Sequence, residues 1–272
     1  MNNTIKLIAL DLDGTLNNDQ KVITASTKEA LLEAQQKGIC LALISGRPAA
    51  GLSRECHALE LAKYNGLLVS YNGAKIADAK SKTILYEKKI PNKMARDLLK
   101  HLQQFPVSVM VTDDVSLYAE DENGYKVKSE AANNQLLVQE VPDLAKAITF
   151  EPVKVLIAAP NEVLLAHQNA ISEPFKEQLS FAISAPFYLE VTMKDISKGS
   201  AINHICQVMN IEANAIMAFG DAQNDVPMLK AAGWGVAMGN ACDDVKAIAD
   251  EVTASNNEDG IAKTLRKHKI CA

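Results

Sequence analysis

This sequence lacks the features that mark a disulfide framework or a membrane protein. Its 272 residues contain only five cysteines, an odd number, and no two are spaced as CxxC, so neither disulfides nor a zinc site are expected. No run approaches the ~18 apolar residues that a membrane span needs. The apolar run at residues 7–10 ends at Asp11 and is too short for a signal peptide. We expect a cytoplasmic protein with no membrane partner.

Excess positive charge is also missing. Lysine and arginine number 28 against 33 aspartates and glutamates, which gives a formal net charge of −5. Nucleic-acid binding normally needs a basic face, so no nucleic-acid partner is expected. A small anionic substrate stays compatible with this charge, because a local pocket can oppose the net charge. The five histidines show no metal-ligand or triad spacing.

The N-terminal segment predicts a βαβ unit. The nearly continuous apolar runs at 5–10 and 39–44 are typical of strands buried on both faces. Between them, Ser26 and Glu29 fit a capping box that would begin a helix, and Gly38 fits its C-terminal end. Consecutive strands joined through a helix are parallel, so side chains that follow their carboxyl ends share one edge of the sheet.

The C-terminal third repeats this alternation, with a helix expected over 198–209, a strand over 215–219, a short helix around 225–232 and a strand near 234–238. The middle differs, because strand-like runs there occur in pairs, 107–111 with 115–119 and 180–184 with 188–192. Helical stretches near 91–104 and 161–173, and a further strand-like run at 153–158, lie between them. We therefore expect a parallel α/β core formed by residues 1–83 and 191–272, with an α+β domain at 84–190.

Four short motifs carry the chemistry: DLDGTL at 11–16, SGR at 45–47, SKG at 197–199 and GDAQND at 220–225. Taken alone, the first fits an acidic turn at a strand end, and the last fits a turn with an Asp N-cap. Together they bring Asp11 and Asp221 to one edge, where two carboxylates about 4 Å apart repel by about 4 kcal/mol. A hard cation such as Mg²⁺ relieves that repulsion, whereas a calcium loop needs its glycine at the sixth position, not the fourth.

The same edge is expected to attract an anion. Lys198 begins a helix that Ser197 can cap, and the N-terminus of a helix favours anions. Ser45 and the backbone of Gly46 add hydroxyl and N–H donors. A metal, a lysine, a hydroxyl and a helix N-terminus together describe a phosphate site. The motifs hold no thiol or basic nucleophile, so a carboxylate is the expected attacking group.

These motifs, in this order, resemble those of the haloacid dehalogenase superfamily, and most closely its Cof-type sugar-phosphate phosphatases. Three further segments share the resemblance: YNGA at 71–74, GVAMGNA at 235–241 and SNNEDGIA at 255–262. The resemblance implies a Rossmann-like core with an inserted α+β cap that selects substrates. It also implies a Mg²⁺-dependent phosphatase that hydrolyses small phosphomonoesters, with sugar phosphates expected, through an aspartyl-phosphate.

The resemblance also assigns roles to residues. Asp11 would be the nucleophile and a metal ligand. Asp13 would be the general acid and then the base, with its carbonyl on the metal. Asp221 would complete the metal site, Asp225 would support it, and Asn224 would lie near the metal or the phosphate.

Ser45 and Lys198 would hold the phosphoryl group, with the backbone of Gly46 beside them. Arg47 and Asn72 fit either a contact with the substrate or a supporting position. Two alternatives stay open: a phosphomutase, which returns the phosphoryl group to the sugar, and a non-catalytic protein that binds a phosphorylated metabolite.

Overall fold

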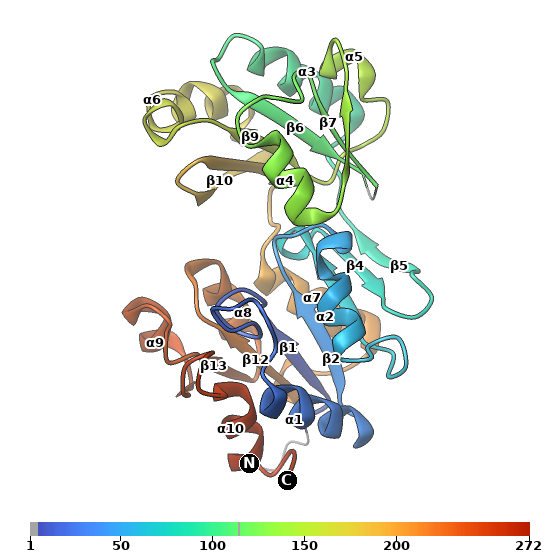
Figure 1. The fold of residues 1–272 in the computed structure, drawn as a ribbon, viewed down its shortest axis with the longest axis vertical. Coiled ribbons are helices and arrows are strands. Elements are labelled where there is room, and N and C mark those ends of the chain that lie inside the picture. Colours follow the sequence, from blue (N-terminus) through green and yellow to red (C-terminus); the bar gives the residue numbers. More distant parts are fainter. Residues whose placement is uncertain (1–4, 114) are drawn as a thin grey trace. The chain divides into compact units, whose positions relative to one another are not determined.

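A computed structural model describes residues 5–113 and 115–272 of the chain (Figure 1). The chain divides into two compact units, one formed by the residues up to Tyr86 together with Ser197–Ala272, the other by Glu87–Ile196. These boundaries differ by a few residues from those expected at 83/84 and 190/191. The reason is local pairing: the strand Ile84–Glu87 joins the sheet of the first unit, and the strand Tyr188–Met193 lies wholly in the sheet of the second.

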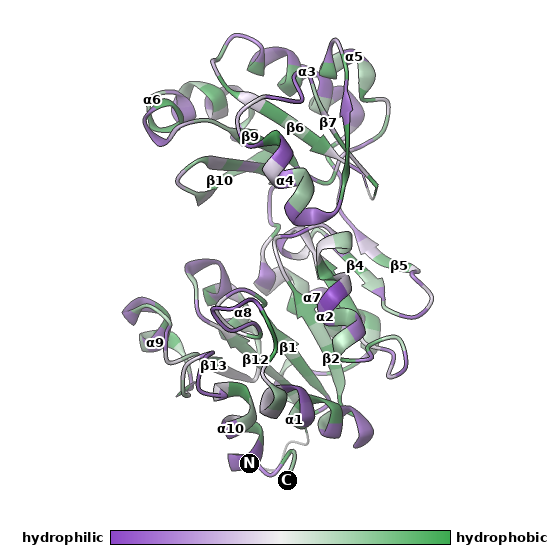
Figure 2. Ribbon diagram, in the orientation of Figure 1, coloured by the Kyte–Doolittle hydropathy of each residue, from purple (hydrophilic) through white to green (hydrophobic). Residues whose placement is uncertain are grey.

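The first unit contains an eight-stranded sheet in the order β14-β13-β12-β1-β2-β3-β4-β5. The strands are β1 (Leu7–Leu10), β2 (Cys40–Ile44), β3 (Leu67–Ser70), β4 (Lys75–Asp78), β5 (Ile84–Glu87), β12 (Ile216–Gly220), β13 (Trp234–Ala237) and β14 (Glu251–Val252). Neighbours from β14 to β3 run parallel, and β4 pairs antiparallel with β3. All residues of β1 and β2 are buried, and Figure 2 shows these central strands as hydrophobic. The expected parallel α/β core is confirmed.

Helices cover both faces of this sheet. They are α1 (Ala25–Gln36), α2 (Ser53–Ala58), α7 (Lys198–Met209), α8 (Val226–Ala231), α9 (Asp243–Ile248) and α10 (Gly260–Lys267), with 3₁₀ turns at Ala49–Leu52, Tyr71–Gly73, Ala213–Ala215 and Gln223–Asp225. Leu31 of α1 and Leu265 of α10 pack in one core cluster, and Ile202 of α7 and Leu229 of α8 pack in another. The alternating apolar strand residues divide between these two clusters.

The start of α1 differs from the capping box expected at Ser26 and Glu29. The helix begins at Ala25, and Thr24 is its N-cap, whose hydroxyl accepts a hydrogen bond from the backbone N of Thr27. That hydroxyl also donates to Asp259, 235 residues away in the sequence, at 2.5 Å. A tertiary contact therefore favours Thr24 over the nearby serine. Gly38 follows the helix with φ of +87°, as expected for the residue that ends it.

The second unit contains a six-stranded sheet in the order β10-β11-β9-β6-β7-β8. Its strands are β6 (Ser108–Thr112), β7 (Ser116–Ala119), β8 (Leu137–Glu140), β9 (Val155–Ala158), β10 (Leu179–Ala185) and β11 (Tyr188–Met193), and its helices are α3 (Asn92–Leu102), α4 (Val127–Asn134), α5 (Leu144–Ala147) and α6 (Asn161–Ser172), with a 3₁₀ turn at Glu173–Phe175. Both expected strand pairs are present and antiparallel. Within the described residues, no helix is both long and apolar enough to span a membrane.

Candidate active site

The predicted site begins where three neighbouring parallel strands end. Asp11 follows β1, Ser45 follows β2 and Asp221 follows β12, and β1 lies between the other two strands. The register pairs Leu10, the last residue of β1, with Phe219 of β12 and Leu43 of β2. Since the strands are parallel and in register, their carboxyl ends place all three side chains at one edge, as the sequence predicted.

A buried lysine joins two of the acidic motifs. The Lys198 side chain is 1% exposed, and its Nζ lies 2.5 Å from Oδ1 of Asp11 and 2.5 Å from Oδ1 of Asp225. Burial disfavours the charged ammonium, but the two carboxylates outweigh it and raise the pKa of Lys198. Lys198 is the first residue of α7, whose N-cap Ser197 forms a capping box with Ser200. The cap fixes the start of the helix and so aims the lysine at both carboxylates.

The three aspartates form one cluster. One oxygen of each carboxylate, from Asp11, Asp221 and Asp225, lies within 4.8 Å of the others. Asp225 is fully buried, and its Oδ2 accepts hydrogen bonds from the backbone N of Asp221 and of Ala222, both at 2.9 Å. Both oxygens of Asp225 are thus engaged within the chain. Its place fits the supporting role that the sequence resemblance implied, with Asp11 and Asp221 better placed to bind a cation.

Burial acts on the remaining two carboxylates. It raises the pKa of Asp11, and the neighbouring Asp225 adds to that effect while Lys198 opposes it. Burial likewise raises the pKa of Asp221, although the hydroxyl of Thr15 donates to its Oδ1 at 2.7 Å. Two crowded, desolvated carboxylates at a sheet edge gain from a divalent cation. Their hard oxygen atoms are the ligands that Mg²⁺ prefers, so the residues present fit that metal.

Asp13 is the more exposed acid of the first motif. Nε of Arg47 donates to its Oδ2 at 3.1 Å, and Nη2 of Arg47 lies 2.6 Å from the same oxygen. Nζ of Lys21 lies 3.0 Å from Oδ1. Burial alone would raise the pKa of Asp13, but Arg47 and Lys21 outweigh it and lower that pKa. Arg47, for which the sequence left two roles open, therefore contacts the predicted general acid.

The side of the site expected to bind phosphate is also assembled. The Ser45 side chain is buried, and its Oγ accepts a hydrogen bond from the backbone N of Arg47 at 3.2 Å. A Cβ atom at Gly46 would come within 3.1 Å of Nδ2 of Asn72, so the missing side chain lets the two loops approach closely. Asn72 adopts φ of +55°, in the left-handed region, and its Oδ1 accepts from Nδ2 of Asn224 at 3.4 Å. These contacts connect three predicted residues from separate motifs.

Sequence reasoning missed three contributors. Thr15 lies within DLDGTL and contacts Asp221, and Lys21 contacts Asp13 from beyond that motif. Asn240, within GVAMGNA, donates from Nδ2 to the carbonyl of Gly14 at 2.8 Å. Gly14 itself has φ of +83°, and a Cβ atom there would collide with the Asp221 carboxylate. Thr15 and Asn240 could have been found as the remaining polar residues of their motifs, whereas no local signal marks Lys21.

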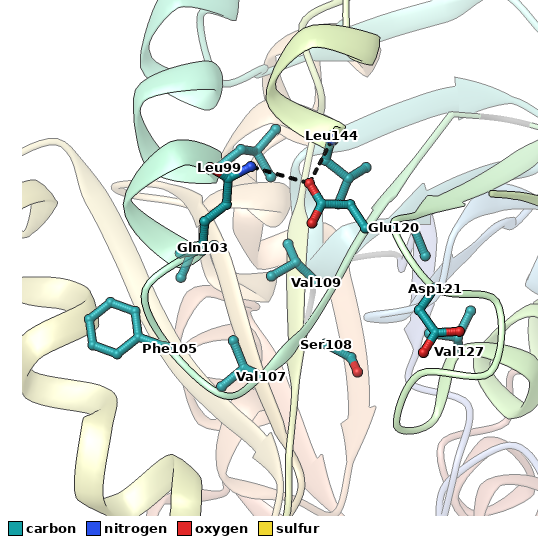
Figure 3. A pocket seen from close by; sticks show the side chains of 12 residues that line it. Leu99, Gln103, Phe105, Val107, Ser108, Val109, Glu120, Asp121, Val127 and Leu144 are labelled. Atoms are coloured by element: carbon teal, nitrogen blue, oxygen red, sulfur yellow. Dashed lines mark hydrogen bonds between the residues drawn. The ribbon is translucent and has the colours of Figure 1, made fainter. Parts of the chain in front are cut away.

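A separate cavity lies in the second unit. It has a volume of about 460 Å³ and is lined mainly by apolar side chains, with Gln103 and Glu120 among the polar ones (Figure 3). Oε1 of Glu120 accepts from the backbone N of Leu144 at 2.8 Å and from Nε2 of Gln103 at 3.4 Å. The predicted site residues all lie in described segments, and none of them lines this cavity.

Comparison with known proteins agrees with this geometry. The model of the haloacid dehalogenase-like hydrolases matches residues 8–265. The chain is similar to the 5-amino-6-(5-phospho-D-ribitylamino)uracil phosphatase YitU of Bacillus subtilis, with 31% identity over 96% of this chain and 97% of that protein.

Solved structures show the same relationship. A haloacid dehalogenase-like hydrolase from Bacteroides thetaiotaomicron matches with a TM-score of 0.91 and 33% identity, covering 97% of this chain and 100% of that one. A subclass IIB sugar phosphatase matches with a TM-score of 0.80 and 26% identity, covering 98% and 100% of the two chains. The four ordered motifs, the parallel core and these matches agree: the chain belongs to the haloacid dehalogenase-like hydrolase family, and its relatives include phosphatases.

Proposed function

We propose that this protein is a Mg²⁺-dependent phosphatase that hydrolyses small phosphomonoesters, sugar phosphates among them, through an aspartyl-phosphate. One observation carries the proposal: the buried Nζ of Lys198 bridges Asp11 and Asp225 beside Asp221 at the end of the parallel strands. A lysine surrounded by three carboxylates offers a cation, a nucleophile and metal ligands at one place. Phosphoryl transfer needs mainly positioning and charge neutralisation, and these groups supply both.

In the first half of the reaction, an oxygen of Asp11 attacks the phosphorus atom. A bond forms between that oxygen and phosphorus while the bond from phosphorus to the ester oxygen breaks. Asp13, two residues further along the same loop, donates its proton to the leaving oxygen, so the product departs as an alcohol. Lys198 supports the step because its ammonium orients Asp11 and faces the negative charge of the phosphoryl group.

In the second half, water attacks the phosphorus of the aspartyl-phosphate. Asp13, now a carboxylate, accepts a proton from that water, and the bond between phosphorus and the Asp11 oxygen breaks. Inorganic phosphate leaves, Asp11 is regenerated as a carboxylate, and Asp13 again carries the proton it needs for the next turnover. Arg47 favours the ionised form of Asp13, the form that accepts the proton from water, because it donates hydrogen bonds to both carboxylate oxygens.

Mg²⁺ would be held by Asp11, Asp221 and the backbone carbonyl of Asp13, with Asp225 supporting Asp221 and Asn224 close by. When bound, the ion neutralises the phosphoryl oxygens and the crowded carboxylates. Around the phosphoryl group, Ser45 offers a hydroxyl and Gly46 a backbone N–H. The capped N-terminus of the 12-residue helix α7 adds the positive end of its dipole. Asn224 donates a hydrogen bond to Asn72, and the two side chains would face the same substrate.

The substrate class rests on similarity and on chemistry. Relatives of the chain are named for a phosphorylated ribitylamino compound and for sugar phosphates, which share a phosphomonoester on a small polyhydroxylated group. We therefore propose sugar phosphates as the first class to examine. Small phosphomonoesters also fit a site in which several hydrogen-bond donors bind the phosphoryl group while other residues bind the rest of the substrate.

A phosphate-release screen tests the proposal. The full chain is incubated with sugar phosphates, flavin mononucleotide and pyridoxal phosphate, each with Mg²⁺ and with EDTA. We expect turnover of at least one sugar phosphate, loss of that turnover in EDTA, and recovery when Mg²⁺ is restored. Phosphate release that is unaffected by EDTA would contradict the metal requirement, and no release from any ester would contradict the phosphatase assignment.

A further inference from the structure

Glu55 is a buried carboxylate that the proposed reaction does not use. It lies on α2, and its side chain is 1% exposed. Its Oε1 accepts hydrogen bonds from Nδ2 of Asn17 at 2.8 Å and from Nη2 of Arg54 at 2.5 Å. Its Oε2 has no hydrogen-bond partner among the described residues. Nε of Arg54 also donates to Oε1, at 3.1 Å, so all three N–H donors meet the same oxygen of Glu55.

Asn17 ends the loop that carries the two reactive aspartates. It is fully buried, its backbone N donates to the carbonyl of Leu12 at 2.9 Å, and it forms a β-bridge with Asp13. On its other side, its carbonyl accepts from Nδ2 of Asn256 at 3.0 Å. Asn17 is thus held at its backbone by Asn256 and at its side chain by Glu55.

The side chains of Asp13 and Asn17, the two residues of the β-bridge, both accept or donate hydrogen bonds to one short segment of the chain. Arg47 bonds the side chain of Asp13, and Glu55, eight residues further along the same segment, bonds the side chain of Asn17. The segment follows β2, whereas the loop follows β1. A hydrogen bond to an ionised acceptor is stronger than one between neutral groups, so the Glu55 carboxylate ties the loop more firmly than an amide would.

We propose that Glu55 is a positioning residue for the reaction: through Asn17 it fixes the loop of residues 11–17 so that Asp13 stays in its reactive place. The inference rests on the proposed phosphatase function. A misplacement of about 1 Å in a reacting group lowers a rate by about 100-fold, so losing this anchor affects turnover more than substrate binding. Asn17 transmits the effect, and both Asn17 and Glu55 are buried.

Two single variants and one double variant test this. Asn17→Asp sets a carboxylate against Glu55, and Glu55→Ala removes the anchor. We expect each to lower kcat by about tenfold or more while KM stays within about twofold. The double variant Asn17→Asp with Glu55→Gln restores a hydrogen bond with its direction reversed, because the amide of Gln donates to the new carboxylate. It should regain most of the lost kcat.

Gln35→Ala is the matched control. Gln35 is also a buried polar residue, and its Nε2 donates to the carbonyl of Leu59 at 2.8 Å, next to α2. We expect this variant to lower the Tm and to leave kcat unchanged at temperatures where it is folded. If Glu55→Ala does not fold, Glu55→Gln replaces it, since it keeps the volume and one acceptor oxygen, and a smaller fall in kcat is then expected.

Three results would overturn the proposal: folded single variants with unchanged kcat, a loss that Gln35→Ala reproduces, or a double variant no better than Asn17→Asp. Failure of the proposed function has a different signature, because the wild-type chain would then release no phosphate from any ester. An active wild type with unaffected variants would overturn the positioning role alone.

Discussion

Arg47 holds the carboxylate of Asp13 by both oxygens. Its Nη2 lies 2.7 Å from Oδ1 and 2.6 Å from Oδ2 of Asp13, and its Nε lies 3.1 Å from Oδ2. A guanidinium in this position favours the ionised acid, and it lowers the pKa of Asp13 despite partial burial. A general acid must carry a proton when the ester bond breaks, so this contact sets the pH range in which Asp13 acts as an acid.

Replacing Arg47 is therefore expected to change the pH dependence of kcat/KM. In Arg47→Ala the cation is gone, the pKa of Asp13 rises, and the acid keeps its proton to higher pH. We expect the alkaline fall of kcat/KM to move to higher pH than in the wild type, measured by phosphate release across a pH series. A shift toward lower pH would contradict the assignment of Asp13 as the acid that Arg47 contacts.

Asp13→Asn should separate esters by their leaving groups. An alkoxide is a poor leaving group and needs the proton that Asp13 supplies, whereas p-nitrophenolate leaves without one. General acid catalysis contributes about 100- to 10,000-fold, so turnover of a sugar phosphate should fall by about that factor. Asp13 also serves as the base for the hydrolytic water, so the two esters are compared in a single turnover, which follows release of the alcohol or phenol in the first half of the reaction. That release should fall much less for p-nitrophenyl phosphate than for the sugar phosphate, and equal losses in this phase would contradict the assignment of Asp13 as the acid.

Glu251, which lies away from the site, is expected to make a pH-dependent contribution to the stability of the folded protein. Burial opposes its charge, but contacts from Lys267, His268 and Trp234 outweigh it and lower the pKa of Glu251. A lowered pKa in the folded state stabilises the protein above the unfolded value, near 4.5, and that stability is lost as the pH falls through the folded value. Glu251→Gln should lower the Tm by a few degrees at pH 7, and the difference from wild type should shrink toward pH 4 in thermal unfolding. A difference that grows on acidification would contradict this.

The sequence predicted the elements and motifs whose signals are local. The helix expected over 198–209 begins at Lys198 and ends at Met209, because its N-cap serine and its apolar spacing agree. The edge shared by Asp11, Ser45 and Asp221 followed from strand order, which the βαβ rule supplies.

The sequence could not predict features that depend on distant contacts. Thr24 was overlooked as a cap because its second partner, Asp259, lies 235 residues away. Helix α4 was also missed: it starts after Lys126, a non-glycine residue with φ of +66°, and no local propensity favours that conformation. The contact between Arg47 and Asp13 could not be predicted either, because it depends on how closely the loop after β1 approaches the loop after β2.

Phosphate release by Asp11→Asn tests the central claim most directly. The substitution keeps the shape of the side chain and removes the attacking carboxylate, so the fold, followed by circular dichroism, should be preserved. With Mg²⁺ and an ester that the wild type hydrolyses, we expect the rate to fall by at least about 1,000-fold. A folded Asp11→Asn protein that releases phosphate at the wild-type rate would show that Asp11 is not the nucleophile, and would contradict the aspartyl-phosphate mechanism.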